Sequence, residues 1–189
     1  IVLVSDKDRH VLAFGCNPEN STTQDPLLVR FSSQANPSDW SAQATNTAGD
    51  LTIGSGSEIV SAIETKQQIL VFTDVSLHAM QFLGPPFTFG INVVSEITIA
   101  SALAAINVED TVYWMGRNEF YAYAGTVQRL PCTVRDYVFN DINSSQLAKI
   151  TAGSNTAFGE IWWFYPSAGS QENDSYVVFN YMENVWSYG

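Results

Sequence analysis

The chain has 189 residues, of which 46% are apolar, 13% are aromatic and only 14% are charged. A disordered acidic segment has few aromatic residues, so this composition excludes that class. The formal net charge is −11, and a surface of this sign repels phosphate backbones, so we expect no general binding of nucleic acid.

Strand signals dominate the chain. Runs rich in Val, Ile, Phe, Tyr and Trp recur about every 8–12 residues and are separated by Gly, Pro, Asn, Asp and Ser. This pattern predicts strands at 11–14, 27–31, 69–73, 77–82, 111–115, 120–123, 127–130, 161–165, 176–181 and 185–186.

The stretches between these runs are of three kinds. Residues 134–146 place Val134, Tyr137, Val138 and Ile142 on one face of a helix, so a short helix is expected there. Residues 95–105 are compatible with either a strand or a helix. The polar, small-residue stretches are expected to be loops, and they are 17–25 and 42–56.

The expected strands group into four units of about 40–50 residues, a size typical of repeated antiparallel sheets. Their approximate bounds are 1–42, 59–94, 99–131 and 147–188. Two units end alike, with a strand, a polar turn and then Trp40-Ser41 or Trp186-Ser187, so we expect Trp40 and Trp186 to hold equivalent places on the last hairpins of their units and to pack against a neighbouring sheet. The prediction is an all-β fold, a β-propeller-like array of about four antiparallel blades in a single domain, 1–189. A β-sandwich is the alternative.

The ends of the chain also carry an expectation. It opens Ile1-Val2-Leu3-Val4 and stops directly after an expected strand, so we expect a fragment of a longer protein. No basic segment followed by an apolar stretch marks a signal peptide. No run reaches the ~18 consecutive apolar residues of a membrane span, and none is expected.

The two histidines do not form a metal-binding pattern. His10 and His78 are far apart in the sequence, and no local spacing supplies three or four zinc ligands. His78 alternates with apolar neighbours in an expected strand, which favours a structural role. Asp6 and Asp8 resemble the start of a calcium loop, but the later ligands are missing, so a solvated turn is expected.

The sequence also contains no recognisable constellation of catalytic residues. No nucleophile elbow occurs, and residues 54–57 form a Gly/Ser turn without a phosphate-binding lysine. A glycosidase needs two facing carboxylates. The candidates are Glu160, Glu172 and Asp174 in the fourth unit and Glu58, Glu64 and Asp74 in the second. Their spacing pairs none of them, so no catalytic, cofactor-binding or metal residue is expected.

Three further expectations concern aromatic, acidic and cysteine side chains. Successive side chains of a strand point to opposite faces, so at most one of Trp162 and Trp163 can meet a ligand, and packing is expected for the pair. Glu160 follows Gly159 and is expected at an exposed blade edge or in a local ion pair. Cys16 and Cys132 are expected to be buried reduced thiols, with a disulfide as the alternative in an oxidising compartment.

An ordered series of motifs runs almost from end to end. It comprises, in chain order, Asp8-Arg9-His10-Val11-Leu12-Ala13-Phe14-Gly15, Asp25-Pro26-Leu27-Leu28-Val29-Arg30-Phe31-Ser32, Asn36-Pro37-Ser38-Asp39-Trp40, Thr45-Asn46-Thr47-Ala48-Gly49-Asp50-Leu51, Ile69-Leu70-Val71-Phe72-Thr73-Asp74, Met80-Gln81-Phe82-Leu83-Gly84-Pro85-Pro86, Val112-Tyr113-Trp114-Met115-Gly116, Phe120-Tyr121-Ala122-Tyr123-Ala124-Gly125, Glu160-Ile161-Trp162-Trp163-Phe164-Tyr165-Pro166 and Tyr176-Val177-Val178-Phe179-Asn180-Tyr181.

This series resembles the propeller-bearing tail proteins of tailed bacteriophages and prophages, the nozzle, tail-tubular or stabilisation proteins of short-tailed phages. The resemblance implies a virion structural protein without catalysis, in a homo-oligomeric ring with other tail and portal-adaptor proteins. It implies assembly in the bacterial cytoplasm and DNA passage without specific binding, for which an acidic surface is suitable. The alternative is a secreted propeller that binds or hydrolyses carbohydrate.

Overall fold

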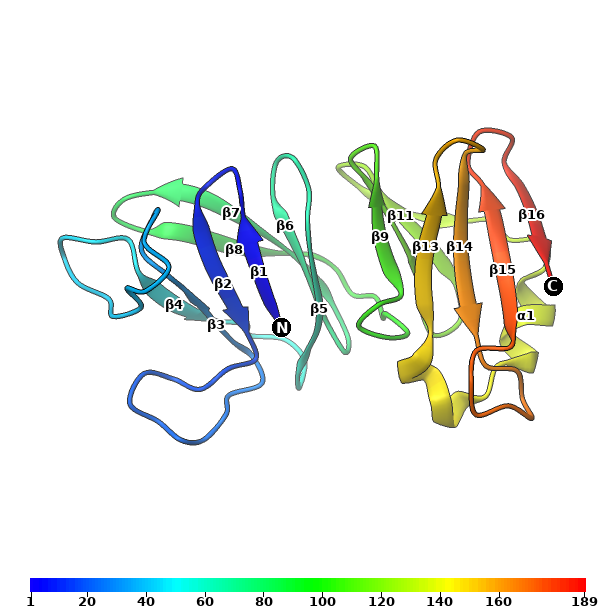
Figure 1. Cartoon of the computed structure of the whole chain (residues 1–189), viewed down its shortest axis with the longest axis horizontal. Helices are drawn as coiled ribbons and strands as arrows, with labels where there is room; N and C mark the ends of the chain where they lie inside the picture. Colours follow the sequence, from blue (N-terminus) through cyan, green and yellow to red (C-terminus); the bar gives the residue numbers. More distant parts are fainter. The chain divides into compact units, whose positions relative to one another are not determined.

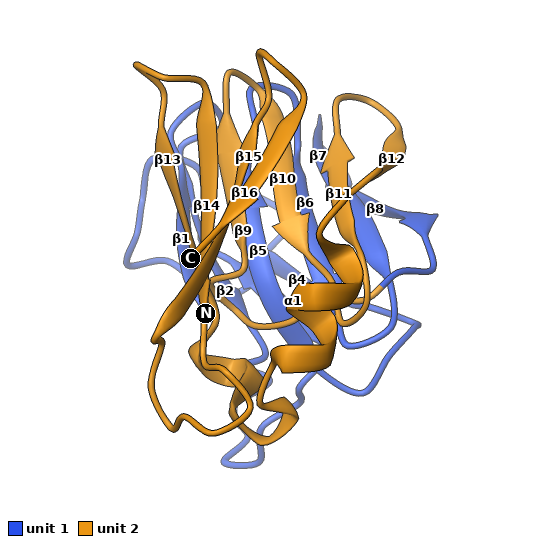
Figure 2. Ribbon diagram, turned by 90° about the vertical axis from the view of Figure 1, so that its right-hand side faces the viewer, with its two compact units in different colours: residues 1–97 blue, residues 98–189 orange.

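The computed structural model describes all 189 residues, and the chain is mostly β, with 46% strand and 7% helix. The expected all-β class is therefore confirmed. Sixteen strands form four antiparallel sheets of four strands each (Figure 1). The chain divides into two compact units, residues 1–97 and 98–189, which are coloured separately in Figure 2 and are described one at a time.

The first unit contains two sheets, and each is completed before the next begins. The strands of its first sheet are β1 (Val2–Ser5), β2 (His10–Phe14), β3 (Leu28–Phe31) and β4 (Gly49–Thr52). The strands of its second sheet are β5 (Ile59–Glu64), β6 (Ile69–Thr73), β7 (Leu77–Gly84) and β8 (Thr88–Ser95). In both sheets the spatial order equals the sequence order, so each sheet is a simple up-and-down meander.

The second unit repeats this plan and adds the helices. The strands of the third sheet are β9 (Ala105–Val108), β10 (Thr111–Met115), β11 (Phe120–Tyr123) and β12 (Val127–Leu130). The strands of the fourth sheet are β13 (Thr151–Asn155), β14 (Glu160–Tyr165), β15 (Ser175–Asn180) and β16 (Val185–Tyr188). The expected short helix is present between them as α1 (Arg135–Asp141), followed by the 3₁₀ helix η1 (Ser144–Lys149).

The largest difference from the sequence prediction lies in the first repeat. The first sheet extends to Thr52 and not to about residue 42, because β4 forms inside a stretch that its polar, small residues mark as loop. Gly49 is accepted in this strand because the ring of Phe31, its cross-strand neighbour, lies over its Cα, 3.0 Å from where a Cβ would stand. A strand's partner, and not its own propensity, can thus decide its formation.

The two Trp-Ser pairs are not equivalent, and this expectation was wrong. Trp186 lies in β16 with 8% of its surface exposed. Trp40 lies in the loop between β3 and β4, half-buried, and its indole nitrogen donates to the main-chain oxygen of Pro37 over 2.8 Å. Pro37 and its neighbours turn the chain back locally, so Trp40 caps its own loop and does not enter a sheet.

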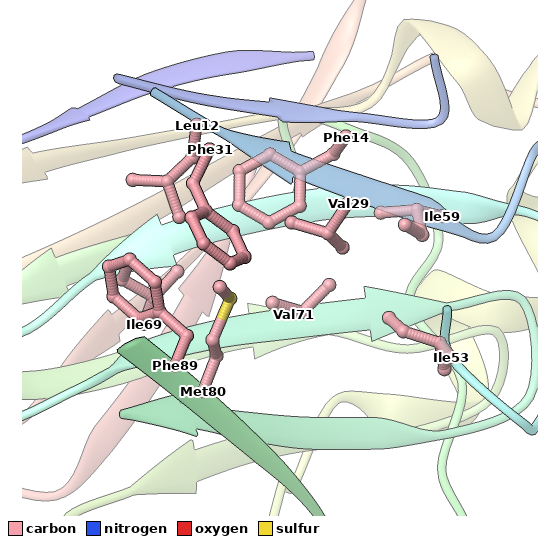
Figure 3. Packing of buried hydrophobic residues seen from close by; sticks show 10 residues of the cluster. All are labelled: Leu12, Phe14, Val29, Phe31, Ile53, Ile59, Ile69, Val71, Met80 and Phe89. Atoms are coloured by element: carbon pink, nitrogen blue, oxygen red, sulfur yellow. The ribbon is translucent and has the colours of Figure 1, made fainter. Parts of the chain in front are cut away.

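The core of the first unit lies between its two sheets (Figure 3). Alternate positions of β2 are buried, as expected for a strand with one face toward a core. The buried cluster comprises Leu12, Phe14, Val29, Phe31, Ile53, Ile59, Ile69, Val71, Met80 and Phe89. Fully burying each side chain of this size contributes roughly 1.5–3 kcal/mol, which makes this cluster the main source of stability in the unit.

The core of the second unit is aromatic. Phe120 on β11 packs 4.9 Å from the ring of Trp163 and 4.7 Å from that of Trp186, measured between ring centroids. The Trp163 indole nitrogen donates to the main-chain oxygen of Ala104 over 3.0 Å, which ties the fourth sheet to the chain just before the third. The burial of each indole is therefore compatible with its polar N–H group.

One strand is buried on both faces. All five residues of β6 are buried, and four of them are apolar. Strands with one solvated face alternate between apolar and polar residues, whereas strands covered on both faces are continuously apolar. The strand β6 therefore has the composition of a strand that is covered on both sides.

Candidate functional site

His10 is part of the first core. It is 1% exposed, its Nδ1 donates to the main-chain oxygen of Asp8 over 2.7 Å, and its Nε2 lies 3.2 Å from the hydroxyl of Thr47. The rings of Phe82 and Phe89 lie 5.4 and 5.1 Å from the imidazole. Burial lowers the pKa of His10, partly opposed by Asp8. Both ring nitrogens are occupied, so this histidine is structural.

His78 is also buried, at 3% exposure in β7, as its alternation with apolar residues predicts. Its Nε2 forms a hydrogen bond with the Ser76 hydroxyl over 2.9 Å, and burial lowers its pKa. No group of three His, Cys, Asp or Glu side chains in the chain lies close enough to hold a metal ion. The two histidines are thus separate hydrogen-bonded groups in the first unit.

The turn that begins with Asp6 joins β1 to β2. The Arg9 amide donates to the main-chain oxygen of Ser5 over 2.7 Å, and the Asp8 carboxylate accepts a hydrogen bond from the Ser5 hydroxyl over 3.3 Å. Arg9 adopts a φ of 56°, in the left-handed region that tight turns use. This is the turn expected from the sequence, held by its own side chains.

Two candidate carboxylates brace loops. Asp74 accepts hydrogen bonds from the amide and the hydroxyl of Ser57, both over 2.7 Å. Asp174 accepts from the amide and hydroxyl of Ser167, both over 2.8 Å. These bonds stabilise the ionised carboxylates and lower the pKa of both aspartates. The geometry is that of loop bracing, because Asp174 bonds within its own loop and Asp74, in the turn after β6, holds the loop before β5.

Three glutamates also have local partners. Glu172 forms an ion pair with Lys149 over 2.6 Å, and Glu64 accepts a hydrogen bond from the Ser5 hydroxyl over 2.9 Å. Glu160 accepts from the indole nitrogen of Trp162 over 3.1 Å. The expectation for Glu160 was wrong: it lies in β14, between β13 and β15, and not at an edge or in an ion pair. Residues two apart in a strand share a face, which brings the carboxylate to the indole.

The Trp162–Trp163 pair divides between the two faces of β14, as strand geometry requires. Trp163 is fully buried, whereas Trp162 is half-buried and lies 5.9 Å from the ring of Phe164 and 5.0 Å from that of Tyr176. We call these three rings, Trp162, Phe164 and Tyr176, the aromatic row. Phe164 is 39% exposed, so the row is accessible on the outer face of the fourth sheet.

The two cysteines lie in different units and are both free. Each is half-buried, and not fully buried as expected. Burial raises the pKa of Cys16, and it raises the pKa of Cys132 to about 11. The thiolate is the reactive form of cysteine, so neither side chain has the electrostatic environment of a nucleophile.

Each unit contains a pocket that sequence reasoning missed. The pocket of the first unit, of about 250 Å³, is lined by Val4, Ser5, Asp6, Arg9, His10, Val11, Ser32, Ala35 and Pro37. The pocket of the second unit, of about 300 Å³, lies between the third and fourth sheets and is lined by Thr111, Tyr113, Ala122, Ala124, Gln128, Leu130, Phe179 and Tyr181. We call the second one the inter-sheet pocket. Glu160 lines neither.

The inter-sheet pocket has one signal in the sequence. Ala122 lies in β11 and Ala124 follows just after the strand, within a segment that is otherwise aromatic, and both line the pocket. Small side chains at these positions leave space beside the facing sheet. The signal becomes visible only when the opposing residues, Phe179 and Tyr181, are known.

An exposed apolar hairpin tip joins β7 to β8. Leu83 is 59% exposed and Phe87 is 74% exposed, on either side of the Pro85–Pro86 turn. Large exposed side chains of this kind occur at contact surfaces. No helix of the chain is both long enough and apolar enough to cross a membrane.

The chain matches no family model and no curated protein. Among solved structures, one that is similar is the crystal structure of a "Putative exported protein" from Bacteroides fragilis. That structure has a TM-score of 0.48 and 7% sequence identity to this chain. The match covers 100% of this chain and 57% of the other, so this chain spans somewhat over half the length of that protein.

Proposed function

We propose that the chain is a non-enzymatic structural segment of a phage or prophage tail protein, a subunit of a ring at the tail nozzle or head-to-tail connection. In this proposal the four sheets are blades of a propeller, and contacts between surfaces, not a reacting group, perform the function. The ring assembles with other tail proteins and passes DNA without binding it specifically. The virion is its location.

The observation that carries the proposal is the sheet topology. The chain completes one four-stranded meander, then a second, a third and a fourth, and no strand leaves its own sheet. This succession is how blades follow one another in a propeller. A sandwich with Greek-key connections would instead exchange strands between sheets.

The apolar faces support the same arrangement. A blade between two others is covered on both faces, and β6 has the continuous burial that such a position requires. The net charge of −11 agrees with a protein that lines or borders a DNA channel, because like charges keep the duplex from adhering. The motif series described above supplies the link to tail proteins.

The test uses the intact gene and its product. We expect portal and tail genes beside it, and we expect electron microscopy of the purified product to reveal rings with a central channel. A monomeric product encoded among secretion and sugar-utilisation genes would contradict the proposal. Gel-shift measurements with duplex DNA at low salt provide a second readout, in which no shift is expected.

The second candidate is a secreted propeller that binds or hydrolyses carbohydrate. The observation in its favour is the aromatic row, since accessible aromatic rings stack on sugars, with Glu160 hydrogen-bonded to one of them. Hydrolysis would require a second acid at ~5–5.5 Å or ~6.5–9.5 Å from Glu160. Glycan turnover that disappears in Glu160→Gln would favour this candidate over the structural role.

A further inference from the structure

The space between the third and fourth sheets is filled at one end and hollow at the other. At the filled end Phe120 meets Trp163 and Trp186. Further along the chain, Ala122 on the same side of β11 and Ala124 just after this strand have small side chains, and the pocket of about 300 Å³ lies over them. Protein interiors are normally packed without voids of this size. Ligand-binding pockets begin at about this volume.

Aromatic rings from both sheets line the pocket: Tyr113 is the cross-strand neighbour of Ala122 in the third sheet, and Phe179 and Tyr181 come from the fourth. Tyr113 lies 5.9 Å from Tyr181, with ring planes 27° apart, and 6.3 Å from Phe179. Phe179 is 4% exposed, whereas both tyrosines are half-buried. The pocket thus combines a fixed apolar base with rings that reach its mouth.

The polar groups of the pocket are neutral. They are the hydroxyls of Thr111, Tyr113 and Tyr181 and the side-chain amide of Gln128. The side-chain amide of Gln128 and the hydroxyl of Tyr181 have no protein hydrogen-bond partner, which leaves donors and acceptors for a ligand. No Asp, Glu, Lys, Arg or His side chain lines the pocket, so it has no group to neutralise a charged ligand.

We propose that the inter-sheet pocket binds a neutral polyhydroxylated ligand, with the size of one sugar ring. Aromatic faces accept the C–H face of such a ring, and an amide with two hydroxyls matches its hydroxyl groups. The absence of a charged side chain in the lining disfavours phosphorylated and carboxylated compounds, because burying an unpaired charge is costly. This site is distinct from the aromatic row and adds ligand binding to the structural role.

The experiment is a titration of the whole chain, ¹⁵N-labelled, with glucose, galactose, mannose and N-acetylglucosamine, followed by amide chemical shifts. We expect shifts at the pocket residues for at least one of the four sugars, with a dissociation constant on the order of 1 mM, as a ligand of this size reaches at modest efficiency. Glucose 6-phosphate is expected to bind at least about tenfold more weakly than glucose.

Three variants locate the site. Gln128→Ala is at an exposed position and is expected to weaken binding about three- to tenfold, as the loss of one or two hydrogen bonds predicts. Ala124→Phe, also at an exposed position, is expected to fill the pocket and abolish binding. Trp162→Ala removes part of the aromatic row and is the matched control, with binding unchanged.

Each other outcome overturns the inference. A folded protein that binds none of the four sugars has no such site. Binding that survives Ala124→Phe and disappears in Trp162→Ala places the sugar on the aromatic row. The spectrum of each unliganded variant shows whether it is folded. If Ala124→Phe does not fold, the loss of affinity in Gln128→Ala still tests the site.

Discussion

The indole nitrogen of Trp186 donates a hydrogen bond of 2.8 Å to the main-chain oxygen of Pro131. Trp186 lies in the last strand of the fourth sheet, and Pro131 follows the last strand of the third. The same indole packs 4.6 Å from the ring of Phe179 and 4.7 Å from that of Phe120. One side chain therefore links the fourth sheet to the third through both ring packing and a hydrogen bond.

Replacing this indole should destabilise the second unit. Trp186→Ala is expected to lower the free energy of unfolding by about 3–5 kcal/mol, because it opens a cavity among aromatic rings. Trp186→Phe keeps much of the packing but leaves the Pro131 oxygen without its donor, so a smaller loss is expected. Urea unfolding followed by far-ultraviolet circular dichroism measures both.

Trp40 provides the matched control. Its indole contacts its own loop through the Pro37 oxygen, and it is only half-buried. Trp40→Ala should therefore cost about 1 kcal/mol or less. Equal losses at the two tryptophans would mean that Trp186 does not have the central position assigned to it.

Ten of the sixteen strands were predictable because their signal is local, whereas β1, β4, β5, β8, β9 and β13 were not predicted. The alternation in β2 and the continuous apolar run of β6 indicate how many faces are covered, and the structure follows both. The helix after residue 134 also followed from its spacing. The division of Trp162 and Trp163 between two faces required only the period of a strand.

The rest depends on contacts between residues far apart in the chain. Trp40 and Trp186 have the same local pattern, but only Trp186 meets a second sheet. The strand β4 depends on its partner β3. The inter-sheet pocket needs Ala122 and Phe179, which lie on different sheets, to be known together. A single sequence specifies no such pairing.

The histidines should make stability depend on pH. Burial lowers the pKa of His10 and His78 from the ordinary value of 6.5, so below that pH the unfolded chain binds protons that the folded chain does not. The free energy of unfolding should therefore fall as the pH decreases from 6.5 to about 5. Urea titrations at several pH values measure this slope.

A substitution separates the histidine contribution from others. His78→Gln removes one titrating group, so the slope between pH 6.5 and about 5 should decrease even if the variant is less stable at every pH. The lowered pKa of Asp74 acts in another range, since its contribution is lost only as the pH falls below the ordinary value of 3.8. An unchanged slope in His78→Gln would contradict the assignment.

A double-mutant cycle can test the contact between Asp74 and Ser57. Asp74→Ala removes the acceptor of two hydrogen bonds from Ser57 and should cost about 1–2 kcal/mol. Ser57→Ala removes only the hydroxyl, so a smaller loss is expected. The double variant should be less destabilised than the sum, by about 0.5 kcal/mol or more. Additive losses would show that the two residues do not interact.

The glycines offer a prediction about packing in the second unit. A Cβ on Gly116 would lie 2.9 Å from the Tyr121 ring and 3.1 Å from the main-chain oxygens of Glu119 and Thr98. Two of these neighbours are backbone and cannot rotate away, so Gly116→Ala should cost about 1–3 kcal/mol. At Gly153, in β13, the nearest atom would be 4.0 Å away, on Phe164, so Gly153→Ala should be neutral or stabilising by up to about 1 kcal/mol. Thermal unfolding of both variants decides the point, and a Gly116→Ala protein as stable as Gly153→Ala would contradict the close approach of the chain at Gly116.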